Sequence, residues 1–298
     1  MSTIENRYDF VFLFDCEDGN PNGDPDSDNS PRFDPETFQG LVSDVCLKRK
    51  IRDYVRYATT AAEDAPKSGY KIFVLSGNTL ESNQKQPFME LTGDDKIEAK
   101  CKDTKPTDIE KARQWMCKNF FDVRAFGAVM STTEFNCGQV RGPVQITFAR
   151  SIDRILPTEH TISRQAFTGE KDIKSGTGTL GRKFTIPYGL YLAHGYINPV
   201  FAAKTGFSED DLTLLWKALA NLFELDRSAA RGTMAARGLY IFKHESKLGN
   251  AQAQRLFESI QVKKRPDIES PRAFTDYTVV PPDPGSLPEG ITLIGGLA

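Results

Sequence analysis

A continuous apolar segment near the start of the chain constrains the fold more than any other feature. Residues 8–16 read YDFVFLFDC, and every side chain between Asp9 and Asp15 is apolar. A run this short, and this rich in aromatic and β-branched residues, is typical of a buried strand. Similar segments predict further strands at 70–77, 183–197 and 237–244, and alternation of apolar and polar residues predicts a half-buried strand at 144–149.

Two amphipathic helices are expected between these strands. In the first, Leu47, Ile51 and Val55 repeat at helical spacing, and Ser43 or Asp44 can cap its start. The second, FSEDDLTLLWKALANLF, begins with a capping-box signature. With the insertions removed, the order is β, α, β, β, α, β, which predicts an α+β fold with a modified ferredoxin-like, RRM-like βαββαβ core. Because this fold hosts many functions, it settles none of them.

The remaining segments are expected to decorate that core. Residues 78–130 predict a helical insertion. Residues 150–183 are polar and contain several Gly, Ser and Thr, which predicts a long β-hairpin protruding from the sheet. Residues 266–298 are rich in proline and acidic residues and are expected to wrap the surface as a tail. We therefore expect a single domain over residues 1–265, followed by this tail.

Composition narrows the functional classes. The net charge is −2 and the pI is about 6.0, whereas a free-standing nucleic-acid-binding domain is usually basic, so nucleic-acid binding must rest on local clusters. No segment approaches the roughly 20 apolar residues of a membrane span, and the start shows no signal peptide. The five cysteines lack the spacing of a metal site, which favours reduced thiols in a cytoplasmic protein without a cofactor.

The strongest local cluster lies on the first predicted helix, VSDVCLKRKIRDYVRYA at 42–58. It holds five cations within nine residues, and only Asp44 and Asp53 dilute them. Solvated helix faces usually mix the two signs so that they pair at i, i+4. The cluster therefore predicts a polyanion contact on the flank that carries Arg49, Arg52 and Arg56, with Lys48 beside them. Lys50 and Arg56 stay uncommitted, with a solvated face as their alternative.

Two other basic motifs leave alternatives open. The segment SAARGTMAARG, at 228–238, repeats an Arg-Gly pair, which suits either a phosphate cradle or a tight turn with close packing. The segment RGPVQITF, at 141–148, partly matches the RNA-binding strand of an RRM, but Pro143 and Gln145 occupy the usual stacking positions. An ordinary core strand is the alternative for this second segment.

The sequence also holds weak signals for catalysis. Asp24, Asp26 and Asp28 have the spacing of a calcium loop without its glycine and final glutamate, which leaves either Asx turns or a magnesium-dependent hydrolase. The segment GTGTLG, at 176–181, opens a strand rather than a helix and so favours a flexible hairpin arm over a dinucleotide site. His160 could act as a general base for cutting RNA.

Five motifs in order resemble one known family. They are NPNGDPD, VSDVCLKRKIRDYV, DVRAFGAVM, GPVQITFARSID and SAARGTMAARGLYIF, and they lie between about residues 8 and 264. They resemble the backbone subunit of type I CRISPR Cascade complexes, closest to the RAMP-related major subunit of type I-C. The resemblance implies a non-catalytic subunit that polymerises head to tail along a guide RNA (crRNA). It also implies that the 150–183 hairpin is a thumb.

The resemblance assigns RNA-binding roles residue by residue. Its helix-start motif matches Ser43, Lys48, Arg49 and Arg52, which would contact guide phosphates, and its loop after the first strand matches Asn20 and Asn22. Looser matches are Arg141 and Arg150 at the base of the thumb, Arg164 on the thumb, and Arg231 and Arg237 in the glycine-rich element. Implied partners are the crRNA, target DNA paired to it, further copies of the chain and other Cascade subunits.

Two enzymatic rivals remain at this stage. The first is a metal-dependent endoribonuclease of the RAMP superfamily that uses Asp24, Asp26 or Asp34. The second is a guide-processing endonuclease that uses His160.

Overall fold

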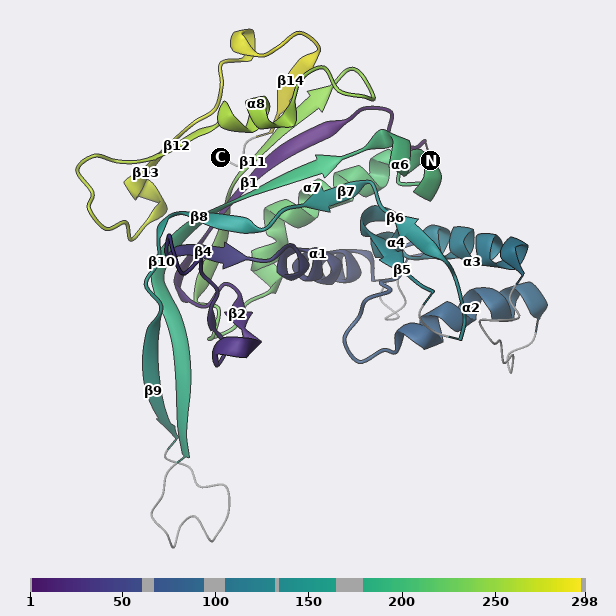
Figure 1. Ribbon diagram of the computed structural model, residues 1–298, viewed down its shortest axis with the longest axis horizontal. Helices are drawn as coiled ribbons and strands as arrows, with labels where there is room; N and C mark the ends of the chain where they lie inside the picture. Colours follow the sequence, from purple (N-terminus) through teal and green to yellow (C-terminus); the bar gives the residue numbers. More distant parts are fainter. Residues whose placement is uncertain (1, 61–66, 94–104, 132–133, 165–178, 296–298) are drawn as a thin grey trace, which may run out of the picture.

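The computed structural model describes residues 2–60, 67–93, 105–131, 134–164 and 179–295. Its centre is a mixed α+β arrangement around a large antiparallel sheet with the strand order β14-β11-β1-β10-β8-β4 (Figure 1). These strands are β1 (Tyr8–Gly19), β4 (Gln39–Val42), β8 (Ala149–Arg154), β10 (Thr179–Ile197), β11 (Thr233–His244) and β14 (Ile291–Ile294). The strand β7 (Val144–Ile146) also pairs with β10.

The first strand lies in the middle of this sheet, as its apolar sequence requires. It pairs with β10 on one side and with β11 on the other. Phe10, Phe12 and Phe14 face one layer of the core, whereas Val11 and Leu13 face the other. Because both faces are covered, the segment has no need for alternating polar residues.

Two long helices, α1 (Asp44–Thr59) and α7 (Glu209–Leu225), cover one face of the sheet (Figure 1). Leu47, Ile51 and Val55 of α1 are fully buried in the same core cluster as the phenylalanines of β1. The Ser43 side chain caps α1, and a Ser208–Asp211 capping box opens α7. Both starts agree with the sequence prediction.

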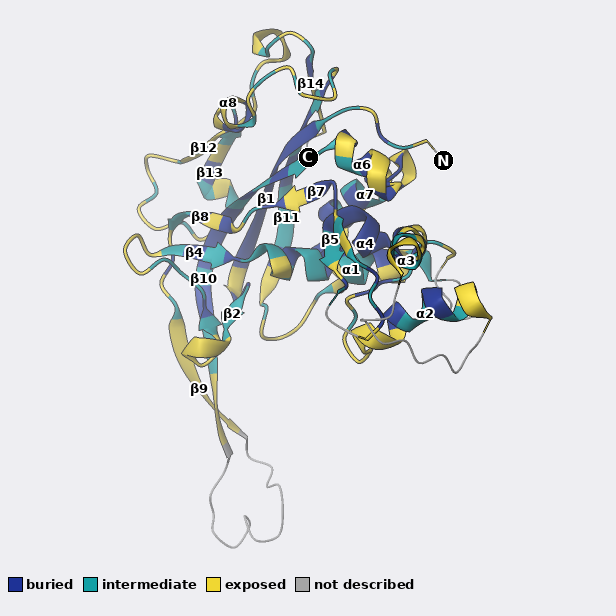
Figure 2. Cartoon of the chain, turned by 45° about the vertical axis from the view of Figure 1, so that its right-hand side comes forward, coloured by how far each residue is buried: buried dark blue, intermediate teal, exposed yellow. Residues whose placement is uncertain are grey.

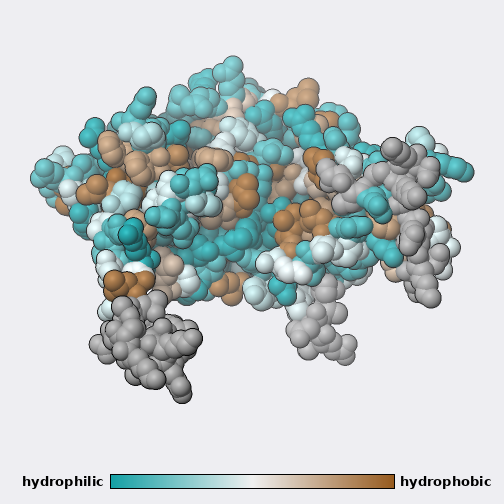
Figure 3. Space-filling model, turned by 60° about the horizontal axis from the view of Figure 1, so that its bottom comes forward, coloured by the Kyte–Doolittle hydropathy of each residue, from teal (hydrophilic) through white to brown (hydrophobic). Residues whose placement is uncertain are grey.

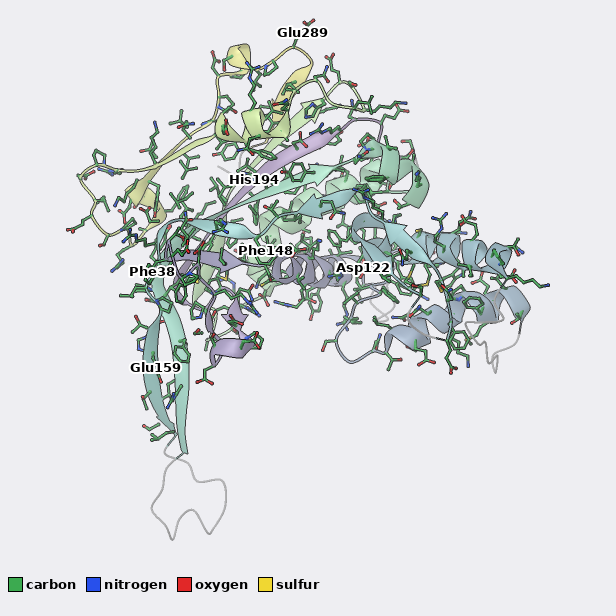
Figure 4. The ribbon with its side chains drawn as sticks, viewed as in Figure 1. Phe38, Asp122, Phe148, Glu159, His194 and Glu289 are labelled. Atoms are coloured by element: carbon green, nitrogen blue, oxygen red, sulfur yellow. The ribbon has the colours of Figure 1, made fainter. Side chains whose placement is uncertain are left out.

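The C-terminal segment covers the other face, with α8 (Ala253–Glu258), β12 (Gln261–Lys264) and β13 (Tyr277–Val280). The Phe257 ring stacks on the His194 ring of β10, with centroids 4.2 Å apart, so this histidine is packed between the sheet and α8 (Figure 4 labels His194). This segment lies along the surface, and it also adds its last strand, β14, to the edge of the main sheet by pairing with β11. The tail sequence is too rich in proline for its short strands to stand out.

The predicted strand at 70–77 is wrong, because this segment is a loop with only an isolated bridge at Lys71. Tyr70, Ile72 and Phe73 are nevertheless buried. The carboxylate of Asp122 accepts hydrogen bonds from the backbone N–H groups of Phe73 and Val74, at 2.8 and 3.0 Å. A side chain thus replaces the partner strand that a buried backbone normally needs.

Helices dominate the segment between α1 and β7: α2 (Leu80–Thr92), α3 (Pro106–Asn119) and α4 (Phe121–Phe126). A two-stranded sheet of β5 (Gly127–Val129) and β6 (Gln139–Arg141) follows. These elements have their own core, which includes Met116 and Phe120. Figure 2 shows buried positions on α2 and α4 in dark blue. Arg124 of α4 ties them to α7 through a buried ion pair with Asp211 at 2.7 Å.

A β-ribbon extends from the lower end of the sheet (Figure 1). It is formed by β9 (Thr158–Arg164) and the first residues of β10, with Thr158 opposite Thr185. Residues 165–178 lie outside the described chain, and so do the first three residues of the GTGTLG segment at 176–181. The shorter elements are β2 (Gly23–Asp24), η1 (Pro25–Ser27), β3 (Ser30–Pro31), α6 (Pro199–Thr205), η3 (Phe274–Asp276) and η4 (Pro284–Ser286). Among the described helices, none is long and apolar enough to cross a membrane.

Candidate nucleic-acid interface

An open pocket of about 530 Å³ lies at the foot of the β9–β10 ribbon. It forms where β1 ends, α1 begins and the loop between α7 and β11 passes. Figure 3 views the molecule from below, and this side is largely hydrophilic between scattered hydrophobic patches. Five residues that the sequence nominated line the pocket together: Asn20, Asn22, Ser43, Arg49 and Arg231.

Asn22 and Ser43 fix the start of α1 at the pocket. The Oδ1 atom of Asn22 accepts hydrogen bonds from both the backbone N–H and the hydroxyl of Ser43, each at 2.9 Å. The Ser43 hydroxyl in turn accepts from the backbone N–H of Cys46 at 3.3 Å. The N-terminus of a 16-residue helix therefore faces the pocket, where its dipole favours an anion.

Asn20 joins three backbone segments around the same pocket. Its backbone N–H donates a hydrogen bond to the carbonyl oxygen of Ala230 at 2.8 Å, and its side-chain amide donates one to the carbonyl oxygen of Asn29 at 2.6 Å. Its Oδ1 atom is buried and accepts no hydrogen bond from a described residue. Asn20 therefore holds the rim of the pocket and keeps one unused acceptor.

The first Arg-Gly pair packs closely against the end of β1. Gly232 has a φ of +61°, and a Cβ atom there would lie 2.2 Å from the carbonyl oxygen of Glu17. A Cβ atom on Gly19 would lie 1.9 Å from the carbonyl oxygen of Arg231. The glycines thus serve chain packing, as the tight-turn alternative predicted, while the arginine remains at the pocket.

Arg49 and Arg231 share a carboxylate at the end of α7. Arg49 donates to both oxygens of Asp226 at 3.2 Å, and the Nε atom of Arg231 lies 2.8 Å from Oδ2. The ammonium of Lys50 also pairs with Asp226, and its side chain is fully buried. A solvated face, the alternative left open for Lys50, is therefore excluded. Burial is the main cause that lowers the pKa of Lys50, to about 7.

The other two cations of the predicted helix motif lie away from this pocket. The Nε atom of Arg52 donates to buried Asp122 at 2.8 Å, and its side chain is only 12% exposed (Figure 4 labels Asp122). Lys48 donates to Asp44 at 2.9 Å. The phosphate contacts predicted for them stay predictions, and the Arg52 ion pair favours a structural role.

Apart from Arg231, the residues with looser assignments lie away from the pocket, at separate places in the molecule. Arg237 lies on the opposite face of the sheet, where it forms an ion pair with Asp15 at 2.8 Å and lies over the Phe274 ring. Burial raises the pKa of the Asp15 carboxyl. Arg141 lies over the Phe201 ring at 4.4 Å. Arg150, 55% exposed, pairs with Asp34 at 3.1 Å. Arg164 ends β9, and its side chain lies outside the described residues.

Two basic residues of β10, Arg182 and Lys183, also line the pocket, although the sequence analysis did not predict a role for them. Arg182 is 66% exposed and pairs with Glu159 across the ribbon at 3.2 Å. Their position in the strand could have been inferred from the segment GRKFTIPYGLYL, since a polar start to a long apolar strand indicates that the strand leaves the core. They extend the basic surface from the pocket onto the ribbon.

The acidic loop uses its carboxylates locally. Asp24 caps η1 through the N–H of Asp26 and pairs with Arg32 at 3.2 Å. Asp34 accepts from the N–H of Glu36 at 3.0 Å; this bond, with Arg150, lowers its pKa. Within the described ranges, no three His, Cys, Asp or Glu side chains are grouped to hold a metal ion. These contacts favour the Asx-turn interpretation of the loop.

The partial RRM strand is mainly a core strand. Val144 and Ile146 are buried beneath the helices, whereas Phe148 is 51% exposed between β7 and β8 (Figure 4).

His160, which the sequence suggested as a general base, lies on the ribbon. Its Nε2 atom is 3.0 Å from the hydroxyl oxygen of Thr185.

Comparison with known proteins places the chain in a family. The model of the family described as CRISPR-associated protein Cas7 matches residues 6–281. The chain belongs to this family. The CRISPR-associated protein Cas7 of Haloferax volcanii is 27% identical over 244 residues, which cover 74% of this chain. The chain spans 66% of the length of that relative, just under two thirds.

Comparison with solved structures also gave matches for this Cas7 family member. A chain of a CRISPR RNA-guided surveillance complex described as pre-nicking has a TM-score of 0.48 and 14% identity, over 79% of this chain and 75% of that chain. A second CRISPR RNA-guided surveillance complex gives a TM-score of 0.44 and 14% identity, over 79% and 68%. A chain of a type III-B Cmr-beta complex bound to cognate target RNA has a TM-score of 0.40 and 10% sequence identity, over 79% of this chain and 61% of that chain.

Proposed function

We propose that the chain is a guide-RNA-binding backbone subunit of a CRISPR effector complex and is not itself a nuclease. One observation carries the proposal: Arg49, Arg231 and the N-terminus of α1 meet at a single open pocket. Guanidinium groups and a helix N-terminus are the groups that proteins use to bind phosphate. Membership of the Cas7 family supports an RNA rather than another polyanion.

The chemistry of the pocket suits the RNA backbone rather than particular bases. Its cations and helix dipole act on phosphate charge, which is the same for every sequence. Binding is therefore independent of guide sequence and strongly dependent on salt, because each neutralised phosphate releases counterions. A subunit with cations along one groove needs no basic overall charge, which reconciles the role with a net charge of −2.

The protruding ribbon is proposed to act as the thumb, within residues 150–183. Arg182 and Lys183 connect it to the pocket, and Arg164 and Arg150 lie at its described end and near its base. Residues 78–130 are proposed as a helical insertion into a domain of residues 1–265, with 266–298 as its C-terminal tail. A separate core within the helical segment supports that division.

We also propose a ferredoxin-like core of type I-C character. The strand order β11-β1-β10-β8, with α1 and α7 on one face, supports a βαββαβ unit in which β8 takes the place first given to residues 70–77. The type I-C assignment rests on the resemblance of the five sequence motifs.

In this proposal copies of the chain assemble head to tail along a crRNA, together with other Cascade subunits, and present the RNA for pairing with target DNA. A heterologous contact between copies generates an open helical array, as a filament on RNA requires. The rival role, a metal-dependent endoribonuclease, would use Asp24, Asp26 or Asp34. The contacts of Asp24 with Arg32 and of Asp34 with Arg150 support turn formation there instead.

The proposal can be tested with the purified full chain and a long single-stranded RNA. We expect RNA-containing particles of stepwise increasing mass, seen by mass photometry. The assembled particles should leave a complementary RNA intact in the presence of Mg²⁺. Cleavage at regular spacing that is lost in Asp34→Ala would contradict the non-catalytic role, and the absence of RNA-bound particles would contradict the scaffold role.

A further inference from the structure

The carboxylate of Asp226 has an unusual set of neighbours beside the pocket. Three cations of the described chain contact it: Arg49 and Lys50 from α1, and Arg231 from the loop before β11. Asp226 itself is 15% exposed and ends α7. A carboxylate with three cationic partners leaves a positive excess, which Asp53 reduces through its ion pair with Arg49.

The contact with Arg231 leaves most of its guanidinium group free. Asp226 pairs with the Nε edge at 2.8 Å, and no described residue accepts a hydrogen bond from the two Nη groups. Arg231 is 27% exposed and lines the pocket. An arginine fixed along one edge loses less conformational freedom when its other nitrogens bind a phosphate.

Lys50 lies on the inner side of the same carboxylate. Its side chain is fully buried over the Phe223 ring, so it cannot reach a ligand in the pocket itself. Its charge acts on the pocket from behind Asp226, with which it forms an ion pair. A buried ammonium in contact with this carboxylate reduces the repulsion that Asp226 would exert on an approaching phosphate.

We propose that Asp226 is the positioning residue of the RNA-binding pocket, which holds Arg231 for phosphate, and that Lys50 offsets the negative charge of Asp226. This inference rests on the RNA-binding role proposed above. It predicts an effect of unusual sign, since removing a negative charge beside an RNA site is expected to weaken RNA binding.

The protonation state of Lys50 should also make the RNA affinity of this cluster depend on pH. The groups that face its ammonium come from three elements and one loop: Cys46, Arg49 and Asp53 on α1, Cys16 on β1, Asp226 at the end of α7, and Arg231. Burial is the main cause that lowers the pKa of Lys50; Arg231 and Arg49 lower it further, whereas Cys46 and Asp53 raise it. Because the ammonium loses its proton as the pH rises, RNA affinity should fall with it.

The test measures the affinity of the full chain for a fluorescein-labelled single-stranded RNA of mixed sequence by fluorescence anisotropy. We expect Asp226→Asn and Lys50→Met each to weaken binding about three- to tenfold. In the double variant the Lys50 change should add little, because no charge is left to offset. Asp53→Asn also removes a negative charge, beside Arg49, but leaves Arg231 held by Asp226, so it should bind RNA at least as tightly as wild type. Arg56→Met, on the last turn of the same helix, is the neutral control and should bind nearly as wild type.

The pH profile separates this role from a structural one. Wild-type affinity should fall between about pH 6 and about pH 9, and Lys50→Met should show a flatter profile. If Lys50→Met does not fold, as judged by circular dichroism, Arg231→Lys replaces it: this change keeps the charge, loses the Nε edge and should bind as weakly as Asp226→Asn.

The possible failures are distinguishable. Asp226→Asn that binds RNA as tightly as wild type, or more tightly, would overturn the positioning role while leaving the proposed function intact. A wild-type chain that binds no RNA would contradict the proposed function and this inference with it.

Discussion

Arg52 of α1 and Asp122 of α4 lie 70 residues apart in sequence and form an ion pair, with Nε and Oδ2 at 2.8 Å. The same carboxylate accepts two backbone hydrogen bonds from the loop at 73–74. One side chain thus joins α1, the loop that replaces a predicted strand, and the helical segment. The relationship favours a structural role for Arg52, for which the sequence alone suggested a phosphate contact.

Replacing Arg52 should therefore destabilise the fold. Arg52→Ala would leave the buried carboxylate of Asp122 without its cation, which we expect to lower the free energy of unfolding by about 3–5 kcal/mol. Urea unfolding measures the effect, and Arg56→Ala, an exposed change on the same helix, should cost less than about 0.5 kcal/mol. An Arg52→Ala chain of normal stability that has lost RNA binding would instead support the phosphate contact.

Sequence periodicity predicted the elements whose contacts are local and failed where distant residues decide. The core faces of α1 and α7 follow from apolar spacing, and β1 from its continuous apolar run. Residues 70–77 have the same apolar character, but a carboxylate from residue 122 binds their backbone. No pattern within the segment can show this.

The residues of the candidate site were also predicted only in part, because distant carboxylates decide which cations reach the pocket. Arg49 and Arg52 lie on one flank of the helix and are equivalent by spacing, yet one meets Asp226 at a pocket and the other meets buried Asp122. Lys50 looked exposed because its neighbours are charged, but it points at the end of α7. Which cation remains available depends on carboxylates about 70 to 180 residues away in sequence.

Gly232 gives a test of the packing beside the pocket. Gly232→Ala would force a side chain into a φ of +61° and against the backbone of Glu17, so we expect a loss of more than about 2 kcal/mol in stability. Gly206 is the matched control, since its φ is +80° but a Cβ atom there has no neighbour within 4 Å. Gly206→Ala should cost only about 1 kcal/mol. Equal losses in thermal or urea unfolding would show that the close approach is unimportant.

The link between Lys50 and folding has a defined sign. Its pKa in the folded chain, about 7, lies below the ordinary value of a lysine in the unfolded chain. Between these values the unfolded chain binds a proton that the folded chain does not, so the Lys50 contribution to stability rises with pH. We expect the free energy of unfolding of wild type, relative to Lys50→Met, to increase between about pH 7 and about pH 9. A constant difference would contradict the lowered pKa.

The ribbon can be shortened without touching the sheet. The pairing of Glu159 with Phe184 permits residues 160–183 to be replaced by a tight turn, while Gly19 still pairs with Ile186. We expect this variant to unfold at the same urea concentration as wild type and to assemble poorly on RNA, as mass photometry would show. Normal assembly by a folded variant would reject the thumb role.

The salt dependence of RNA binding tests the central claim most directly. The slope of log affinity against log salt counts the phosphates that a protein neutralises. We expect Arg49→Ala and Arg231→Ala each to reduce this slope by about one and to weaken binding equally for RNAs of unrelated sequence, with Arg56→Ala unchanged. Slopes that remain at the wild-type value in both pocket variants would contradict the phosphate site.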